Sequence, residues 1–513
     1  MAQTEPVTAP AATEDFDVST QGDVAKLKKG AVGLGGVLFL TLTGSAPITA
    51  MLLNVPILVG SGQGLGAPAA FIVAAVVLVI FSVGYVAMSR KKTATGGFYS
   101  YISHGLGREI GFGAGFGSLV AYGVFEASLA GGFAYFANLK LASLGVHVGW
   151  APLALGMVVV IGVLTYFDVS FSAKILAVGL ITEVLILLFF DAMLLARGHI
   201  YWSALNPGEA FKSFSASPGK GIAAGGAIGI GLFFAFWSWV GFEMAPNYGE
   251  ESRNPKKNVP RSLYISVIGL GVFYTITCWA SLAGYSSINS AIASAQGNAA
   301  NFFFVPSTQY AGHWVTSVMS YLIITGSFAC GMAFHNTTAR YAYSLGREGM
   351  LPPILGKTHP RWQSPHIASI AASLLSLIII GLFAIFVGTN DPSSQAYGQL
   401  YGLMAVMGVI IILSVQALVS LAILVYYLRY HRDEVHWWKT LLAPVLAFIS
   451  QGYVVYLLFE NLNFLGAGTY GYAKLFGPID AAVVLIGIGL AFYYKKYKPE
   501  TFDKVGRLIN EGL

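Results

Sequence analysis

The chain has 513 residues, of which 56% are hydrophobic and 10% are charged, whereas an average soluble domain carries about 25% charged residues. A soluble chain of this length would form about three domains and would need charged side chains to cover them. The composition therefore excludes a soluble enzyme, a disordered chain and a nucleic-acid-binding protein, although the net charge is +6. Two cysteines, Cys278 and Cys330, form neither a disulfide framework nor a cysteine-rich metal site, and we expect no metal and no cofactor.

Twelve transmembrane helices are predicted, because the chain contains twelve stretches of the roughly 20 mostly apolar residues that cross a bilayer. They cover residues 31–58, 67–89, 111–138, 151–168, 172–196, 222–248, 261–284, 313–345, 366–388, 398–428, 440–460 and 476–497. Residues 1–25 are polar, which predicts a flexible cytoplasmic tail and not a signal peptide. Residues 499–513 are predicted to form a second cytoplasmic tail.

The basic residues alternate between the two sides of these spans. If the N-terminus lies inside the cell, 24 of the 29 Lys and Arg residues fall in cytoplasmic segments. The five on the other side are Lys140, Arg197, Lys212, Lys220 and Lys474. Because Lys and Arg favour the cytoplasmic ends of spans, this distribution predicts an even number of spans with both termini inside.

The first and sixth spans contain residues that interrupt a helix. In the first, Gly44-Ser45-Ala46-Pro47 separates two apolar runs, and Pro47 suits the first turn of a new helix. A simple proline kink is the alternative. In the sixth, Ser238 and Gly241 stand in mid-span, just before Glu243. Interruptions at corresponding positions in two halves are typical of inverted-repeat transporters that bind their substrate at the membrane midplane.

An interrupted helix offers backbone groups to a ligand. The amides after Gly44 suit a carboxylate, and the carbonyls near Leu42, Thr43, Trp237 and Ser238 suit an ammonium group. An α-amino acid carries both groups about 2.5 Å apart. The predicted substrate-binding residues are Thr43, Gly44, Ser45, Ala46, Pro47, Phe236, Trp237, Ser238 and Gly241.

Three segments resemble the amino acid–polyamine–organocation (APC) superfamily of transporters, which share the LeuT-type fold. The first combines Phe234–Glu243 with the run E-E-S-R-N-P-K-K-N-V-P-R-S at 250–262. The second is Asn336–Pro352, which contains Gly346-Arg347-Glu348-Gly349. The third is Gly96–Tyr101, and together the matches extend over roughly residues 25–460 in family order. Many members begin the first interruption with G-S-G; the G-S-A-P found here resembles a Pro-containing branch of bacterial permeases.

The resemblance implies an all-α membrane protein of twelve transmembrane helices, with helices 1 and 6 interrupted. Ten helices in a LeuT-type 5+5 inverted repeat would occupy residues 26–430, with the first repeat at 26–200 and the second at 222–430. Residues 431–498 would form helices 11 and 12. The implied function is secondary transport of an amino acid or small amine across the cytoplasmic membrane, by a monomer or homodimer that binds membrane lipid and no nucleic acid.

Three acids inside the spans are candidates for proton coupling, because charge within a bilayer is costly and usually functional. Glu183 stands in the fifth span, where the resemblance places a lysine in proton-coupled relatives and an ion site in sodium-coupled ones. Glu243 follows the second interruption, and relatives use this position for protons or gating. Glu126 lies in the third span. A structural hydrogen bond is the alternative for each.

Gating is predicted for Trp237, Glu243 and Arg340, since in relatives an aromatic residue at the Trp237 position closes over the substrate. Thr325 and Ser327 in the eighth span are candidate ligands of an ion site, although such hydroxyls usually bond to their own preceding turn.

The remaining predictions concern His335, the basic segments, the mode of coupling and the class of membrane protein. His335 is expected to form hydrogen bonds on the loop side of the eighth span. The basic segments 90–92 and 253–261 are explained by topology and by attraction to anionic lipid. Proton symport is the first prediction for coupling, followed by exchange and sodium symport. A membrane enzyme or a channel is the alternative class, but the sequence contains neither an H-E-x-x-H set nor a repeated filter.

Overall fold

The computed structural model describes residues 32–91, 97–167, 169–249, 252–462, 471–503 and 505. The predicted N-terminal tail, most of the C-terminal tail and the acidic pair at 250–251 lie outside this part of the chain.

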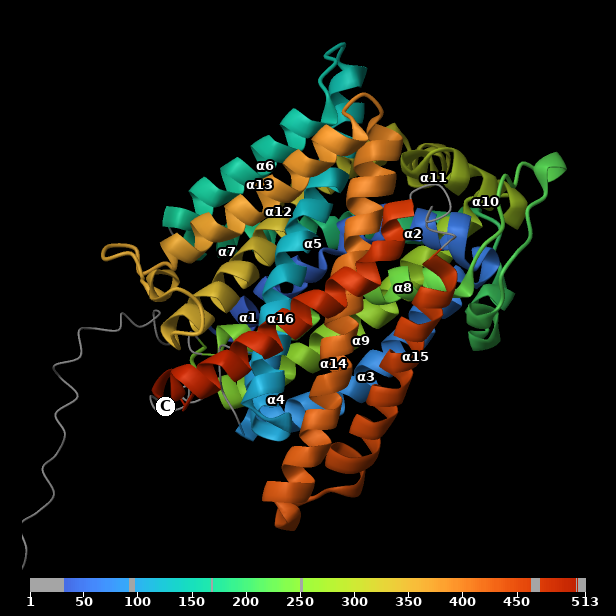
Figure 1. The fold of residues 1–513 in the computed structure, drawn as a ribbon. Coiled ribbons are helices and arrows are strands. Elements are labelled where there is room, and N and C mark those ends of the chain that lie inside the picture. The colour runs from blue at the N-terminus through green and yellow to red at the C-terminus, as the bar shows by residue number, and fades with distance from the viewer. Residues whose placement is uncertain are drawn as a thin grey trace, which may run out of the picture.

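Twelve helical segments in the described part are long and apolar enough to cross a membrane (Figure 1). In order they are α1 (Leu34–Ser45) with α2 (Pro47–Ile57), α3 (Ala67–Lys91), α5 (Arg108–Ser143), α6 (Trp150–Phe167), α7 (Val169–Arg197), α8 (Ile228–Trp237) with the 3₁₀ segment Phe242–Tyr248, α9 (Pro255–Ala283), α12 (His313–Arg347), α13 (His366–Val387), α14 (Gly402–Tyr430), α15 (Ala443–Asn461) and α16 (Phe476–Tyr497). Within the described residues there are only isolated β-bridges, so the predicted all-α fold with twelve spans is confirmed.

Both predicted interruptions are present. Helix α1 ends at Ser45, Ala46 adopts a left-handed conformation with a φ of 33°, and α2 begins at Pro47. Helix α8 ends at Trp237, and the chain then turns through Gly241, whose φ is 120°, into the 3₁₀ segment Phe242–Tyr248. Proline at the first helical position and glycine at a positive φ are the residues that these conformations favour.

The structure also differs from the sequence-based prediction. Helices α4 (Gly97–Leu106), α10 (Ile288–Gly297), α11 (Ala299–Pro306) and α17 (Pro499–Asp503) are too short to span a membrane and were not predicted. The sixth span begins at Ile228 and not at 222, because Gly225 and Gly226 disfavour a helix and residues 226–227 bond to distant backbone groups.

The interrupted helices lie inside the bundle. In its most apolar stretch the sixth span is 94% buried, whereas the ninth and twelfth spans are 17% and 22% buried. Figure 1 shows α6, α13, α12 and α7 gathered on one side, α3, α14 and α15 on the other, and α1 and α8 between them. The ninth and twelfth spans therefore have most of their surface on the outside of the bundle, and the interruptions occupy the core.

Candidate functional site

The two interruptions touch at their backbones. A Cβ atom added to Gly241 would lie 2.5 Å from the carbonyl carbon of Gly44 and 2.7 Å from the backbone nitrogen of Ser45. The Ser45 hydroxyl also donates to the Trp239 carbonyl at 3.3 Å. Glycine at position 241 is therefore required both by its positive φ and by this close approach.

A small cavity lies beside this contact. The centre of a water-sized sphere can occupy about 20 Å³ of it, which is enough for about one water molecule. An amino acid, the ligand predicted from the sequence, is larger than this cavity. The lining residues are Gly44, Ser45, Ala46, Thr49, Ala50, Asn54, Leu129, Trp237, Ser238, Val240, Cys330, Phe334 and Tyr401.

Five of the nine predicted substrate-binding residues line this cavity: Gly44, Ser45, Ala46, Trp237 and Ser238. The other four are absent from the lining. The Thr43 hydroxyl bonds back to the Phe39 carbonyl of its own helix at 2.7 Å, and the Phe236 side chain is buried away from the cavity. Pro47 starts α2, and Gly241 forms the backbone contact described above.

Other lining residues were missed by the sequence analysis. Ala50 and Asn54 follow Ala46 at intervals of four, which places them on one face of α2, so a signal for them was present. Cys330 and Tyr401 come from the eighth and tenth spans, and sequence spacing alone does not give the rotation of those helices.

Hydrogen bonds join the first, sixth and tenth spans on one side of the cavity. The Trp237 Nε1 group donates to the Tyr401 hydroxyl at 2.9 Å, and Tyr401 donates to Asn54 Oδ1. Asn54 Nδ2 then donates to Ser238 Oγ at 2.8 Å. We call these four residues the neutral closure. The Trp237 ring also packs on Phe125 at a centroid distance of 4.4 Å.

Glu243 lies just beyond the second interruption. Its Oε1 atom accepts from the Tyr122 hydroxyl at 2.7 Å and its Oε2 atom from the Gly241 backbone N–H at 2.9 Å. The Tyr85 hydroxyl donates to its backbone carbonyl at 3.1 Å. Glu243 is 2% exposed. The carboxyl group thus ties the second interruption to the third span.

Arg340 also contacts the sixth span. Its guanidinium is 4.8 Å from the centre of the Tyr248 ring, at the end of the sixth span, and the residue is 4% exposed. The neighbouring Tyr341 ring stacks on Tyr122 at 5.7 Å. A buried cation over an aromatic face holds the two elements together, so the eighth span is linked to the sixth and third.

Glu183 contacts the first interruption from the fifth span. It is 5% exposed and lies near the backbone N–H of Ile48, in the first turn of α2. A Cβ atom on Gly326 of α12 would lie 2.7 Å from Glu183 Oε1 and 3.0 Å from Thr49 Oγ1. The carboxyl group therefore lies between α2, α7 and α12, next to a residue that lines the cavity.

The hydroxyls of Thr49, Thr325 and Ser327 differ in their bonding. Among the described residues, the buried hydroxyls of Thr49 and Ser327 have no hydrogen-bond partner. Thr325, in contrast, is exposed and bonds back to the carbonyls of Tyr321 and Leu322 in its own helix. The structure thus places Ser327 inside the bundle and Thr325 on its outer surface.

Glu126 forms a separate buried cluster. Its Oε1 atom is 3.0 Å from His335 Nδ1, and its Oε2 atom accepts from Ser376 Oγ at 2.7 Å. His335 Nε2 is 2.9 Å from Ser369 Oγ. Both Glu126 and His335 are 0% exposed. His335 therefore lies in the helix bundle and not on the loop side, because it pairs with a buried acid on α5.

The backbone carbonyls at the end of α1 accept hydrogen bonds from two side chains. Cys330 Sγ donates to the Gly44 carbonyl at 3.1 Å, and the Tyr274 hydroxyl donates to the Ser45 carbonyl at 2.8 Å. None of the described residues that line the cavity is charged. Within the described part of the chain, no group of three or more His, Cys, Asp or Glu residues is arranged to hold a metal ion.

Comparison with known proteins gives a match to the family model described as amino acid permease, over residues 36–493. The branched-chain amino acid permease BcaP of Bacillus subtilis is 22% identical over 69% of this chain and 75% of its own length. BcaP of Lactococcus lactis is 26% identical over 58% of this chain and 64% of its own length. The low-affinity putrescine importer PlaP of Escherichia coli is 22% identical over 61% of this chain and 66% of its own length.

Proposed function

The chain belongs to the amino acid permease family, whose members are multi-pass membrane transporters and not enzymes, and from this premise we propose that it carries an amino acid or small amine by proton-coupled symport. The observation that carries the proposal is the cavity between two interrupted helices, with Glu183 beside the amide end of the second segment of one of them.

The interruptions suit the two charged groups of an α-amino acid. The start of α2 presents backbone amides, which attract a carboxylate. The end of α1 presents the Gly44 and Ser45 carbonyls, which already accept hydrogen bonds from Cys330 and Tyr274 and which suit an ammonium group. A substrate that enters the cavity would compete with or share these contacts.

The cavity favours a neutral substrate. Its described lining contains apolar side chains, hydroxyls, one amide, one indole and one thiol, and no acid or base. A diamine or a dicarboxylic amino acid would leave a second charge buried without a partner, which is costly. We therefore place a neutral amino acid ahead of an amine as the substrate, in line with the names of the two branched-chain permeases.

Alternating access would occur around this cavity, whose described lining residues are all buried. With both termini cytoplasmic, as the basic residues predict, the neutral closure faces the outside, and Glu243, with Arg340, faces the cytoplasm. We place the 5+5 repeat at residues 26–200 and 222–430, which puts one interruption in each half. In this scheme either closure opens while the other stays shut.

Glu183 is the group we assign to the coupling proton. When ionised, its carboxylate is attracted to the amide end of α2; when protonated, it loses that charge-assisted contact. Proton binding is thereby linked to the position of α2, which lines the cavity. Glu243 is the second candidate. The hydrogen bonds of Glu126 with His335 and Ser376 favour a fixed structural link for that residue.

Sodium symport is supported by one observation. The hydroxyls of Thr49 and Ser327 lack hydrogen-bond partners within the described residues. A Cβ atom added to Gly326 would approach both Thr49 Oγ1 and Glu183 Oε1, so these two oxygens lie on the same side of that glycine. A carboxylate oxygen and a hydroxyl oxygen side by side, as in Glu183 and Thr49, are the type of ligand that a hard cation takes.

The test is uptake of radiolabelled leucine by purified protein in liposomes. We expect accumulation when the interior is alkaline, and competition by neutral amino acids but not by glutamate or putrescine. Accumulation driven by a sodium gradient alone would show that sodium, and not the proton, is the coupling ion. Exchange with preloaded leucine, but no accumulation under either gradient, would indicate an exchanger.

A further inference from the structure

A basic cleft lies where α3 ends and α9 begins. Its described lining is Arg90, Lys256, Lys257, Pro260, Arg261 and Tyr264, and its volume is about 480 Å³. All four basic residues are exposed. The cleft therefore combines four positive charges with an aromatic side chain.

These charges are not balanced by nearby acids in the described structure. Among the described residues, no ion pair involves Arg90, Lys256, Lys257 or Arg261, and α9 has no acid in its first turn. The N-terminal end of α9 adds the positive end of its dipole to Lys256 and Lys257. An anion bound here would be attracted by all of these charges at once.

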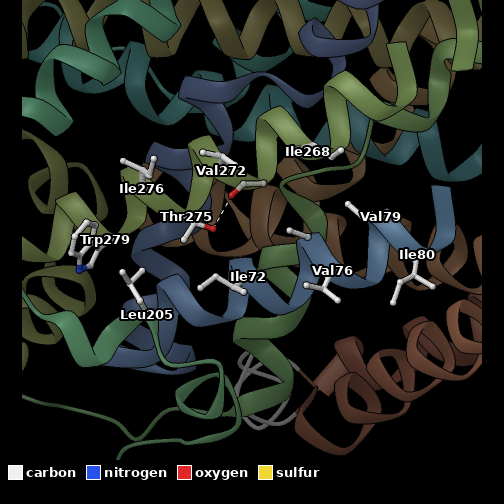
Figure 2. A pocket seen from close by; sticks show the side chains of 12 residues that line it. Ile72, Val76, Val79, Ile80, Leu205, Ile268, Val272, Thr275, Ile276 and Trp279 are labelled. Carbon is white, nitrogen blue, oxygen red and sulfur yellow. Dashed lines mark hydrogen bonds between the residues drawn. The ribbon is translucent and has the colours of Figure 1, made fainter. Parts of the chain in front are cut away.

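An apolar groove runs along the same two helices (Figure 2). Its volume is about 570 Å³. Figure 2 shows Ile72, Val76, Val79 and Ile80 of α3 facing Ile268, Val272, Ile276 and Trp279 of α9 across it. The single hydroxyl, of Thr275, donates to the Gly271 carbonyl of its own helix at 2.7 Å, so the groove offers almost no polar group to a ligand.

The cleft and the groove are separated by a distance that a lipid can bridge. From Arg261 to Ile268 is seven residues, or about 10 Å along α9, and from Arg90 to Ile80 is ten residues, or about 15 Å along α3. One leaflet of the hydrocarbon core is about 15 Å thick. A chain that starts at the cleft would therefore reach the near end of the groove.

We propose that this cleft and groove together bind one anionic phospholipid, with its phosphate among Arg90, Lys256, Lys257 and Arg261 and an acyl chain against Ile80 and Ile268. The groove distinguishes a lipid from a soluble phosphate, because only a lipid presents an anion and a long apolar chain in this order. The site does not depend on the transport reaction, so its test is independent of the proposed function.

The experiment is native mass spectrometry of the full chain, purified in detergent and titrated with phosphatidylglycerol or phosphatidylcholine. We expect phosphatidylglycerol to bind more tightly. The triple variant Lys256→Gln/Lys257→Gln/Arg261→Gln is expected to weaken its binding by about a hundredfold, since each such charge contributes about tenfold or less. The matched control is Arg429→Gln/Arg432→Gln/Lys439→Gln, which removes three exposed charges from the same predicted membrane surface outside the cleft.

Two further arms separate the alternatives. Ile268→Trp places a bulky indole ring at the near end of the groove and is expected to weaken binding severalfold. Its control is Ile378→Trp on lipid-facing α13, because the two positions are similarly exposed, at 50% and 59%. Inorganic phosphate is expected not to displace the lipid. Equal binding by the cleft and control triple variants would overturn the proposal, as would equal binding by the two tryptophan variants or displacement by phosphate.

Discussion

The two interruptions use the same chemistry with different connections. In each, a glutamate lies at a backbone N–H at the start of the second segment: Glu183 lies near that of Ile48, and Glu243 accepts a hydrogen bond from that of Gly241. Glu243 stands two residues from its donor and extends the contact to Tyr122 of the third span. Glu183 belongs to the fifth span, so its contact joins two elements that are far apart in the chain.

This difference gives the two acids different tasks. A change of charge at Glu243 acts first on the geometry of its own segment, because donor and acceptor are almost adjacent. A change of charge at Glu183 acts on the attachment of α2 to α7 and α12. We therefore expect the coupling of a proton to helix movement to depend on Glu183 and closure of the cavity to depend on Glu243.

The largest effect is expected from Gly241→Ala, which would separate the two interruptions. The new Cβ atom would lie 2.5 Å from the Gly44 carbonyl carbon, and the positive φ of 120° would add backbone strain. Together these cost on the order of 3 kcal/mol or more, and we expect loss of transport with lower thermal stability in detergent. Gly269→Ala is the control, because nothing lies within 4 Å of its added Cβ atom. Equal stability of both variants would contradict the close contact.

The next effect is expected from Glu183→Gln, which removes the charge and keeps the shape. A gradient of one pH unit corresponds to about 1.36 kcal/mol, or a tenfold accumulation for one coupled proton. We expect this ratio to fall to one, while exchange of labelled leucine persists because the cavity is intact. The measurement is the steady-state ratio in liposomes. Accumulation that remains tenfold would remove Glu183 from the coupling role.

A smaller effect is expected from Glu243→Gln. The amide oxygen can still accept from Gly241, but the charge-assisted bond with Tyr122 is lost, and such bonds contribute about 1.5–3 kcal/mol. We expect the initial rate of uptake to fall by between about tenfold and a hundredfold, with the accumulation ratio unchanged. Loss of the ratio with little change in rate would reverse the roles of Glu243 and Glu183.

The sequence predicted the elements better than their mutual contacts. The twelve spans follow from apolar stretches, and both interruptions follow from local residues such as Pro47 and Gly241. The partners of those residues depend on the rotation and tilt of distant helices. For that reason Cys330 and Tyr401 were missed at the cavity, and His335 was placed at a loop although it pairs with Glu126.

The smallest effect is expected from Tyr122→Phe, which removes one donor from Glu243 and keeps the aromatic packing on Tyr341. Because the carboxyl group keeps its bond with Gly241, we expect the lower end of the range for a charge-assisted bond, about 1.5 kcal/mol, which corresponds to an initial uptake rate about tenfold lower. The same substitution in the Glu243→Gln background should have little further effect if Tyr122 acts through that carboxyl group, so a double-mutant cycle of initial uptake rates measures the link. Additive effects would show that Tyr122 acts elsewhere, and the second interruption would then be held by its own segment alone.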